Sequence, residues 1–555
     1  MPVKHKLSIL SFLTILLAAA FGGFLGDKVN AGGPLGDSSE QQQMKNFTRV
    51  LQLVSENYAY PIDTEDLVES GIRGMLHTLD PHSSFFDTRD YTRLQEEQQG
   101  KYYGLGITIR PISPGSGRVV VVEPPAPGTP AFKAGLRAGD IITHIRNEPI
   151  DDWETEDVIG HLKGPKGTKV DITIERPGVQ NPIPMTVERD EISMYAIHDA
   201  FMIRPRVGYI KINRFSDTTS DELEAALDKM DQATLEGLIL DLRGNPGGAL
   251  NQAIRVTNQF LKKGQVIVST RNRHGKENEH KAPTGSNYRY PMVVLIDRYS
   301  ASASEIVSGA LQDHDRALII GETSFGKALV QTIYTLSDRK GLALTTGRYY
   351  TPSDRLIQRD YSGGFYDYYY NRKENSDATP SGEVKMTDSG RKVYGGGGIA
   401  PDVKMSVEAN KIQTMLNARD VFFSYAHKLI AGDVPVARNF RLPAKTADLS
   451  EVEQKKLMDS LVITDVILED FKNHLKEKAV IISAEDFQKN TDFIKRRIKK
   501  EVFDSFFGSR EGYKVAIEGD EVVQKGIQLL PEAKALLQRS EKPDKNMVAT
   551  STLSK

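Results

Sequence analysis

Cysteine is absent from this chain of 555 residues. The absence excludes disulfide bonds, thiolate catalysis, cysteine-ligated zinc and a lipid-modified N-terminal cysteine. It leaves the compartment open, because many exported proteins have no disulfides. A strong net charge is also absent, since 72 lysines and arginines face 74 aspartates and glutamates, for a formal net charge of -2. No global positive field results, so we expect no nucleic-acid partner.

The sequence also lacks two motifs that mark common hydrolases, the Gly-x-Ser-x-Gly elbow and the His-Glu-x-x-His zinc motif. His77, His82 and His314 have no convincing partners in the sequence, and we interpret them as solvated or structural. A near-match to a phosphate-binding loop, Gly321-x4-Gly326-Lys327, continues with Ala328. Because the hydroxyl that would hold magnesium is missing there, the sequence disfavours nucleotide binding.

The N-terminus carries an export pattern. Lys4 and Lys6 precede an uncharged apolar run over residues 7–25. Small residues at the end of the run would allow cleavage, whereas its length is close to the roughly 20 residues that an uncleaved membrane anchor requires. Residues 1–30 are therefore predicted to be either a signal peptide or a membrane anchor. The two lysines place the rest of the chain across the membrane from the cytoplasm.

Two amphipathic helices are predicted within an N-terminal helical region at residues 38–97. Apolar side chains recur at helical spacing over residues 44–54 and again over residues 67–76, after an N-cap near Asp63. A helical pair this short cannot build its own core, so we expect it to pack on another domain or on a second subunit. The same argument favours a homo-oligomer.

Residues 98–190 change character to short strands separated by turns. The stretch opens with Tyr103-Gly104-Leu105-Gly106-Ile107 and continues with a Gly- and Ala-rich segment at residues 130–142. This combination resembles a PDZ domain. The backbone amides of the Gly-Leu-Gly-Ile loop would form a nest for the terminal carboxylate of a peptide, and a groove would take its apolar last side chain. The alternative is that these glycines only turn a small sheet.

Strands and helices alternate after residue 195, which predicts an α/β core over residues 191–405. Open α/β sheets place their sites at the carboxyl ends of the strands. Three motifs follow predicted strands directly: Asp241-Leu242-Arg243-Gly244-Asn245-Pro246-Gly247-Gly248, Ser300-Ala301-Ser302-Ala303-Ser304-Glu305 and Gly321-Glu322-Thr323-Ser324-Phe325-Gly326-Lys327. Structural alternatives stay open, because Ser302 and Glu305 also suit a capping box and the glycines also suit a tight turn.

These motifs suggest a mechanism in which Ser302 is a nucleophile and Lys327 its general base. A neutral lysine can take this role where no histidine is placed. Bringing a lysine pKa from about 10.4 to near neutral pH costs roughly 4 kcal/mol, which burial beside Phe325 and Val330 could supply. Gln331 could reach and orient Lys327 if a helix or a compact turn continues there.

Backbone amides would complete such a site. The amides of Gly247, Gly248 and Ala303 could bind the oxyanion of a tetrahedral intermediate. Glycine suits this task because the substrate must approach the backbone closely. The proximity of these groups is at this point a hypothesis from chemistry alone.

The ordered set of motifs resembles the carboxy-terminal processing proteases, also called tail-specific proteases. The resemblance covers residues 40–405 and rests on the PDZ signature, the three motifs above and Gln331 after Lys327. It is completed by Tyr349-Tyr350-Thr351-Pro352-Ser353 and Gly398-Ile399-Ala400-Pro401-Asp402.

The resemblance implies that Ser302 is the nucleophile, Lys327 the base and Gln331 the residue that positions the lysine. It implies an α/β core of crotonase-like or ClpP-like type with an inserted PDZ domain, and serine endopeptidase activity without a cofactor. Its substrates would be exported proteins with apolar C-terminal tails, which the PDZ domain delivers or gates. We therefore expect the chain at the periplasmic side of a bacterial cell envelope, anchored in the inner membrane or soluble, with an adaptor or activator protein as a further partner.

The sequence departs from the family pattern in three places. Ala328 and Leu329 replace the usual Gly-Thr after the lysine, which would reshape the wall of the site. A polar insertion at residues 359–397 is interpreted as a solvated loop, with a substrate or partner contact as the alternative. Residues 406–540 are a predicted helical extension for docking or oligomerisation, followed by a disordered tail at residues 541–555.

Two functions of other classes stay open. A catalytically silent PDZ scaffold would be expected to have lost Ser302 or Lys327, and both are present. An esterase on a related core would not need a peptide groove.

Overall fold

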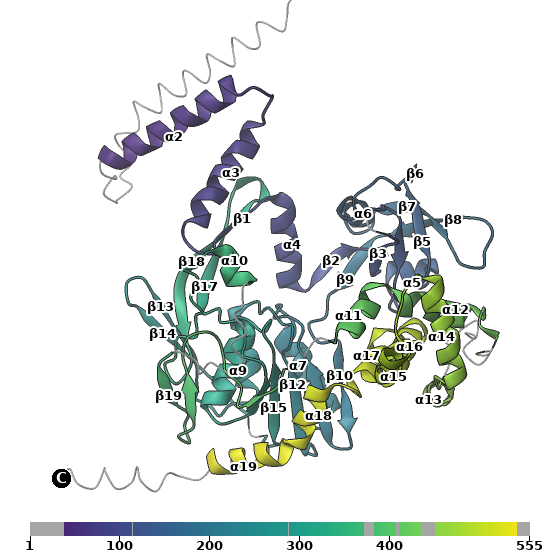
Figure 1. Ribbon diagram of the computed structural model, residues 1–555. Coiled ribbons are helices and arrows are strands. Elements are labelled where there is room, and N and C mark those ends of the chain that lie inside the picture. The colour runs from purple at the N-terminus through teal and green to yellow at the C-terminus, as the bar shows by residue number, and fades with distance from the viewer. Residues whose placement is uncertain are drawn as a thin grey trace, which may run out of the picture. The chain divides into compact units, whose positions relative to one another are not determined.

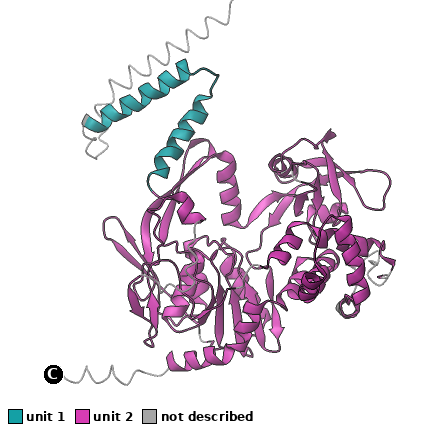
Figure 2. Ribbon diagram, in the orientation of Figure 1, with its two compact units in different colours: residues 1–79 teal, residues 80–555 magenta. Residues whose placement is uncertain are grey.

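The computed structural model describes residues 38–113, 115–286, 288–370, 382–406, 410–435, 437 and 450–540. Two compact units make up the chain, residues 1–79 and residues 80–555 (Figure 2). The predicted signal peptide or anchor and the predicted disordered tail lie outside the described residues. Within the described ranges, no helix combines the length and apolar character needed to span a bilayer.

The first unit contains the two predicted helices, α2 (Ser38–Asn57) and α3 (Thr64–His77). The predicted cap is confirmed, since the Asp63 side chain accepts a hydrogen bond of 2.7 Å from Glu65 N. The apolar residues of α2 are largely exposed, and they include Met44, Phe47, Val50, Leu53 and Val54.

The second unit begins at residue 80, inside the predicted helical region of residues 38–97. Strand β1 (Ser84–Phe86) pairs with β18 (Gly341–Tyr350), and helix α4 (Thr88–Gln99) follows in the same unit. Residues 80–97 therefore do not belong with α2 and α3 as predicted. The reason is that Phe85 is buried in the register Phe85↔Leu342, a long-range pairing that helical periodicity does not reveal.

The PDZ-like segment forms an antiparallel sheet in the order β3-β4-β5-β7-β8, with β6 beside β5. Alternate side chains of these strands build a separate core with the helices α5 and α6. A short ribbon of β2 with β9 joins this module to its neighbours. The elements are β2 (Lys101–Gly104), β3 (Ile109–Pro111), β4 (Val119–Val121), α5 (Pro130–Ala134), β5 (Ile141–Ile145), β6 (Glu148–Pro149), α6 (Thr155–Leu162), β7 (Lys169–Glu175), β8 (Ile183–Glu188) and β9 (Asp190–Ser193).

A six-stranded sheet in the order β10-β11-β12-β15-β16-β21 carries the candidate motifs at its carboxyl edge. Its strands β10, β12 and β15 are labelled in Figure 1. Five strands are parallel, and β10 is antiparallel to β11. The strands are β10 (Asp199–Arg204), β11 (Val207–Lys211), β12 (Gly237–Asp241), β15 (Met292–Ile296), β16 (Leu318–Gly321) and β21 (Val403–Lys404).

Both faces of this sheet are buried, as the continuous apolar runs of its central strands require. Leu240 and Val294 pack on one face with the helices α7 (Thr219–Lys229), α8 (Leu250–Asn258) and α9 (Ala303–Asp313). Ile239 and Val293 point to the other face. There the helices α18 (Glu521–Gln528) and α19 (Leu530–Ser540) of the C-terminal extension cover them.

The rest of the C-terminal extension is a helical bundle with its own core. Arg110 of the PDZ-like module contacts it, with Nη1 at 2.6 Å from Asp420 Oδ1 and the guanidinium 4.7 Å from the centre of the Phe423 ring. The extension therefore contacts both the module and the sheet. Its remaining helices are α11 (Lys411–Ala418), α12 (Val421–Ala431), α13 (Glu451–Ser460), α14 (Asp465–Glu477), α15 (Ala484–Lys489), α16 (Thr491–Phe507) and α17 (Ser509–Ile517).

A second sheet, β1-β18-β13-β14 with β17 on β18, stands beside α9. The insertion at residues 359–397, interpreted as a solvated loop, contains regular structure in its described part. It forms helix α10 (Phe365–Tyr369), whose Tyr368 is 2% exposed, and the hairpin β19 (Val384–Met386) and β20 (Lys392–Tyr394). The loop interpretation was wrong because tyrosines inside a polar stretch can be buried. The remaining strands are β13 (Val266–Asn272), β14 (Glu277–Lys281) and β17 (Leu329–Thr335).

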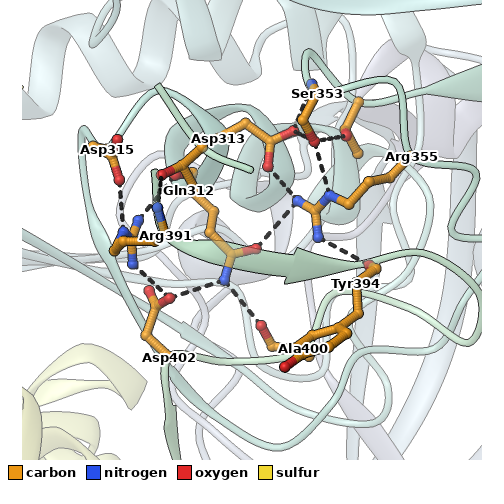
Figure 3. A network of polar contacts seen from close by, with 11 residues as sticks. Gln312, Asp313, Asp315, Ser353, Arg355, Arg391, Tyr394, Ala400 and Asp402 are labelled. Atoms are coloured by element: carbon orange, nitrogen blue, oxygen red, sulfur yellow. Dashed lines mark hydrogen bonds and ion pairs between the residues drawn. The ribbon is translucent and has the colours of Figure 1, made fainter. Parts of the chain in front are cut away.

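Arg355 fixes the C-terminal end of α9 (Figure 3). Its guanidinium pairs with Asp313, and both side chains are essentially inaccessible, at 0% and 1% exposure. Nη1 donates to Tyr394 O at 3.1 Å and Nε to Ser353 Oγ at 3.1 Å, while Ser353 N donates to Asp313 Oδ2 at 2.9 Å. Every polar group of the buried pair is thus satisfied, as a buried charge pair requires.

Arg391 fixes the same helix end from the other side. Nε donates to Asp315 Oδ1 and Nη1 to Asp402 Oδ1, both at 2.6 Å, and Nη2 donates to Gln312 O at 3.0 Å. The hairpin of the insertion therefore clamps α9 to the edge strand β21, as the network in Figure 3 shows. Since Ser302 immediately precedes α9, these contacts hold the helix that presents it.

We predict that Arg355→Ala lowers the free energy of unfolding by about 3–5 kcal/mol, because it leaves the Asp313 charge buried and unpaired. Urea unfolding followed by circular dichroism measures the change. Arg206→Ala is the matched control, since its partner Glu236 and Arg206 itself are 60% and 64% exposed and an exposed pair contributes about 0–1 kcal/mol. Equal effects of the two substitutions would contradict the role given to Arg355.

Candidate active site

Ser302 lies where the chain turns from β15 into α9. Its backbone has φ 53° and ψ −110°, a conformation that residues other than glycine rarely adopt. Strain of this kind costs about 1–3 kcal/mol and persists only where the surroundings impose it. The side chain is partly exposed, whereas its neighbours Ala301 and Ala303 are buried. The turn therefore presents one hydroxyl at the N-terminus of an eleven-residue helix.

The carboxylate of Glu305 imposes this geometry. It is fully buried, and its Oε2 accepts hydrogen bonds from Ser302 N at 2.8 Å and from Lys327 N at 2.9 Å. Its Oε1 accepts from Ser324 Oγ and Gly326 N, both at 2.6 Å. One oxygen thus joins the backbone of the predicted nucleophile to that of the predicted base. The sequence indicated only a helix cap for Glu305, and it missed this second set of contacts.

Tyr349 ties the same two residues through their carbonyl groups. Its hydroxyl contacts Lys327 O, and it lies 3.2 Å from Ser302 O. The ring is 2% exposed, and burial raises the pKa of this tyrosine well above its ordinary value, so it stays protonated. The Tyr-Tyr-Thr-Pro-Ser motif is thereby explained in part, since its first tyrosine contacts both carbonyl groups and Ser353 donates to the side chain of Asp313, the last residue of α9.

Lys327 and Gln331 are in contact, as predicted, but by another route. Lys327 Nζ donates to Gln331 Oε1 at 2.9 Å. The expected helix or compact turn is wrong, because Gln331 lies in β17 beside an irregularity in the pairing with β18 between Val330 and Gln331. The same strand argues against the phosphate-loop alternative, since the chain continues after Gly326 into β17 and not into a helix whose N-terminus could bind a phosphate.

Burial lowers the pKa of Lys327, against the opposing charges of Glu305 and Asp80. The direction is the one that a lysine base requires. Among the described residues, no hydrogen bond joins Lys327 Nζ to Ser302 Oγ. The structure thus brings the two residues together through Glu305 and Tyr349, and it holds the amine on Gln331.

The glycine loop packs directly on the start of α9. Gly247 and Gly248 have φ of 102° and 144°. A Cβ atom on Gly247 would lie 2.8 Å from Ser302 Cβ and 2.9 Å from Ala303 N, and one on Gly248 would lie 2.2 Å from Phe215 O. Only glycine fits at either position.

The prediction that three amides bind the oxyanion needs one correction. Gly247 N already donates to Asn245 Oδ1 at 2.8 Å, so this amide is occupied. Gly248 N and Ala303 N have no hydrogen-bond acceptor among the described residues, and they remain the candidates. Asn245 is fully buried, and it also accepts from Ala301 N at 3.0 Å through its carbonyl group, which holds the loop against the serine turn.

Behind this loop lies a buried ion pair that the sequence did not indicate. Asp241, fully buried, accepts from Arg243 Nη2 at 2.6 Å, and Arg243 also pairs with Asp520 of the C-terminal extension at 2.9 Å. Tyr209 completes the set with a hydrogen bond of 2.8 Å to Asp241 Oδ2. The extension therefore helps to fix the loop that carries the glycines.

Two histidines have partners that the sequence did not suggest. His314 contacts Asp388 Oδ2 and Val266 O, each at 2.7 Å, and is structural as interpreted. His82 lies beside the active site, where its carbonyl group accepts from Gln331 Nε2. His77 is the last residue of α3. The described residues contain no cluster of three side chains suited to a metal ion.

The predicted tail-binding loop is built as a tight turn of the PDZ-like module. Leu105 is buried in its core, and Leu105 O accepts from Ala131 N at 2.9 Å. Gly106 has φ 76° with Thr129 packed against it, Gly104 is buried and Tyr103 is 40% exposed. Ile107 packs on the same core just before β3, which is the first strand in the sheet order of the described residues.

Comparison with known protein families agrees with this arrangement. Residues 206–364 match Peptidase family S41, and residues 121–176 match the PDZ domain. Residues 28–90 match the N-terminal domain of the activating protease CtpB.

Two curated relatives extend the match over most of their own length. A carboxy-terminal-processing protease of Bartonella bacilliformis is 40% identical over 330 residues, which are 58% of this chain and 74% of the relative. The chain belongs to the carboxy-terminal processing proteases. CtpA of Bacillus subtilis is 30% identical over 360 residues, 65% of this protease and 76% of the relative. Among solved structures, the photosystem II D1 C-terminal processing protease is 25% identical, with a TM-score of 0.35 over 67% of this chain and 94% of that one.

The departure from the family pattern after Lys327 lies in the core of this protease. Ala328 and Leu329 are 0% and 4% exposed, and Ala328 N donates to Gln358 Oε1 at 2.8 Å. Because neither side chain is accessible, these two replacements can alter the wall of the site only through the packing of the residues around them.

We predict that Glu305 makes stability fall with rising pH. Burial raises the pKa of Glu305 from 4.5 to about 7, opposed by its hydrogen bonds from Ser324 and the loop amides. The folded state then holds a proton that the unfolded state releases, so this contribution is fully present below pH 4.5 and is lost by about pH 7. Its size is up to about 3 kcal/mol.

Urea unfolding of the wild type and of Glu305→Gln between pH 4 and pH 8, in steps, measures the effect, and only the wild type should show this slope. Asp199 and Asp504, whose pKa values are also raised to about 6 by burial, contribute equally to both proteins and cancel in the difference. Parallel stability curves for the two proteins would contradict the assignment.

Proposed function

We propose that this protease is a serine endopeptidase that cleaves exported proteins near their C-termini with a Ser302–Lys327 dyad. The observation that carries the proposal is the shared oxygen of Glu305, which holds the amides of both residues within 2.9 Å. A serine without a histidine needs another base, and Lys327 is the partly buried amine beside it. The family of relatives supports peptide hydrolysis as the reaction.

In the proposed mechanism, Ser302 Oγ attacks the scissile carbonyl carbon as the neutral amine of Lys327 accepts its proton. The oxyanion that forms is bound by Gly248 N and Ala303 N, at the positive end of α9. Lys327 then returns the proton to the departing amine as the peptide bond breaks and leaves an acyl-enzyme. A water molecule, deprotonated by Lys327, hydrolyses the ester and regenerates Ser302.

The contact that this mechanism needs forms when substrate binds. Catalytic hydrogen bonds are often long without substrate and tighten in the Michaelis complex. Gln331 holds Lys327 Nζ as an acceptor in the meantime, which leaves the lone pair of a neutral amine free to face the serine.

The PDZ module supplies the selection of substrate tails in this proposal. The edge strand β3 would pair with an extended peptide, and the loop of Tyr103, Gly104, Leu105, Gly106 and Ile107 would receive its carboxylate. The contact between Arg110 and Asp420 places the helical extension beside that edge strand, which supports a gating role.

Three finer points belong to the same proposal. We place the core in the crotonase-like or ClpP-like type, supported by its parallel sheet with α8 and α9 after β12 and β15. We place the protein at the periplasmic side of a bacterial envelope, supported by the N-terminal export pattern. We expect a homo-oligomer, supported by the exposed apolar residues of α2.

We predict that Ser302→Ala and Lys327→Ala each lower kcat/KM by at least about 10³-fold, because the dyad acts as a unit. Lys327→Arg should be equally inactive, since an arginine cannot lose its proton in a protein. Cleavage of an unstructured test protein with an apolar C-terminus measures the rates. Ser337→Ala and Lys229→Ala, at exposed residues that are not among the candidate site residues, are the controls. Activity that survives in the dyad variants would reopen the scaffold and esterase alternatives.

We also predict that replacing the last apolar residue of the test protein with aspartate raises KM several-fold and leaves kcat of the bound substrate unchanged. The apolar groove would lose its side chain while the catalytic residues stay in place. Steady-state kinetics on the two substrates measure the split. Identical KM values would exclude tail recognition by the PDZ module.

A further inference from the structure

Helix α10 of the insertion lies against the residues that surround Lys327. Tyr368 and Tyr369 pack with Phe325 and His82 in one aromatic cluster, with ring centres 5.0 to 6.5 Å apart. The Arg359 guanidinium lies 4.5 Å from the centre of the Phe325 ring and 4.7 Å from that of Tyr368. Tyr368 is 2% exposed. The cluster is therefore a packed wall, to which the insertion contributes Arg359, Tyr368 and Tyr369.

The hydrogen bonds of the two tyrosines fix the His82 ring in one state. Tyr369 OH donates to Pro81 O at 3.1 Å, so its oxygen accepts from His82 Nδ1 at 3.3 Å. His82 Nε2 is then the acceptor, and it receives Tyr368 OH at 2.8 Å. Tyr368 in turn accepts from Gln358 Nε2 at 3.3 Å. Every donor in this chain finds an acceptor with a neutral imidazole, whereas a charged imidazole would leave the Tyr368 hydroxyl hydrogen without its acceptor Nε2.

Electrostatics agree with the neutral ring. Burial, followed by the nearby charge of Lys327, lowers the pKa of His82 to about 3, although Asp80 opposes the shift. His82 is therefore no acid or base in the physiological range.

The backbone carbonyl group of His82 links this chain of hydrogen bonds to Gln331 and, through it, to Lys327. Gln331 Nε2 donates to His82 O, which forces the other end of the amide, Oε1, toward Lys327 Nζ at 2.9 Å. A glutamine amide without such an acceptor is free to turn its NH₂ group toward the amine, where it would face the donors of a charged lysine or occupy the lone pair of a neutral one. The position of His82 therefore decides which end of Gln331 meets Lys327.

We propose that Tyr368 and Tyr369 are positioning residues for catalysis, which hold His82 so that Gln331 presents its oxygen to Lys327. This inference rests on the proposed Ser302–Lys327 mechanism and adds to it a role for the insertion. The insertion then belongs to the active site. The tyrosines touch no reacting atom, and they act through His82 and Gln331.

The test replaces both hydroxyls and keeps both rings, in the full chain with Tyr368→Phe and Tyr369→Phe combined. We expect kcat on the unstructured test protein to fall about 10- to 100-fold, as for a base displaced from its working geometry, with KM within about twofold of the wild type. Tyr366→Phe with Tyr370→Phe is the matched control, since Tyr366 lies in the same helix and Tyr370 is its C-cap. These two tyrosines are each 70% exposed, and kcat should not change.

The pH profile separates positioning from a general loss of structure. The loosened wall admits water to Lys327, so the acid limb of kcat/KM, where the lysine loses its proton, should move to higher pH. The charged and titratable groups that face Lys327 are Asp80, His82, Glu305 and Arg359 with the tyrosines, and only the tyrosines are changed. An unshifted limb with a lowered kcat would overturn the proposal.

A double-mutant cycle tests the route through Gln331. In a Gln331→Ala background, the two Phe substitutions should lower kcat by less than about twofold, because their effect has already been lost. Additive losses would mean that the tyrosines act elsewhere and would overturn the inference. If the Ser302 and Lys327 variants are inactive while the double Phe variant equals the wild type, this inference fails and the dyad stands. If the dyad variants stay active, the proposed function itself fails.

Discussion

The buried carboxylate of Glu305 sets the geometry of the candidate active site. Glu305 receives four hydrogen bonds, two on each oxygen, from the serine turn and from the loop that ends at Lys327. Burying a carboxylate is unfavourable unless its acceptors are filled, so the two loops are held wherever those four donors can meet. The strained backbone of Ser302 and the close approach of the glycine loop follow from that arrangement.

The surrounding elements all act on the same few residues. Arg355 and Arg391 clamp the far end of α9, while the C-terminal extension reaches the glycine loop through Asp520 and Arg243. The insertion reaches Gln331 through His82. Elements far apart in the sequence thus meet at Ser302, Lys327 and Gln331, where they would hold the proposed nucleophile and base in place.

The sequence indicated the candidate site residues more directly than it indicated their surroundings. Ser302, Lys327 and Gln331 follow from motifs at strand ends, where parallel sheets place their sites, and the structure brings them together. For Glu305 the sequence indicates only a cap, because three of its four donors are contributed by a loop 19 to 22 residues away. Tyr368 and His82 are 286 residues apart, and no local pattern joins them. The strand at Gln331 was missed because β17 is defined by its pairing with β18.

The most direct measurement of the central claim is the rate at which an active-site-directed fluorophosphonate labels the protein, with the modified residue identified by mass spectrometry across a pH series. A serine activated by a buried lysine should give one adduct, on Ser302, at a rate that rises with pH as the lysine loses its proton. The labelling should disappear in Lys327→Ala. An adduct on another residue, or a Ser302 rate that ignores both pH and the loss of Lys327, would contradict the account.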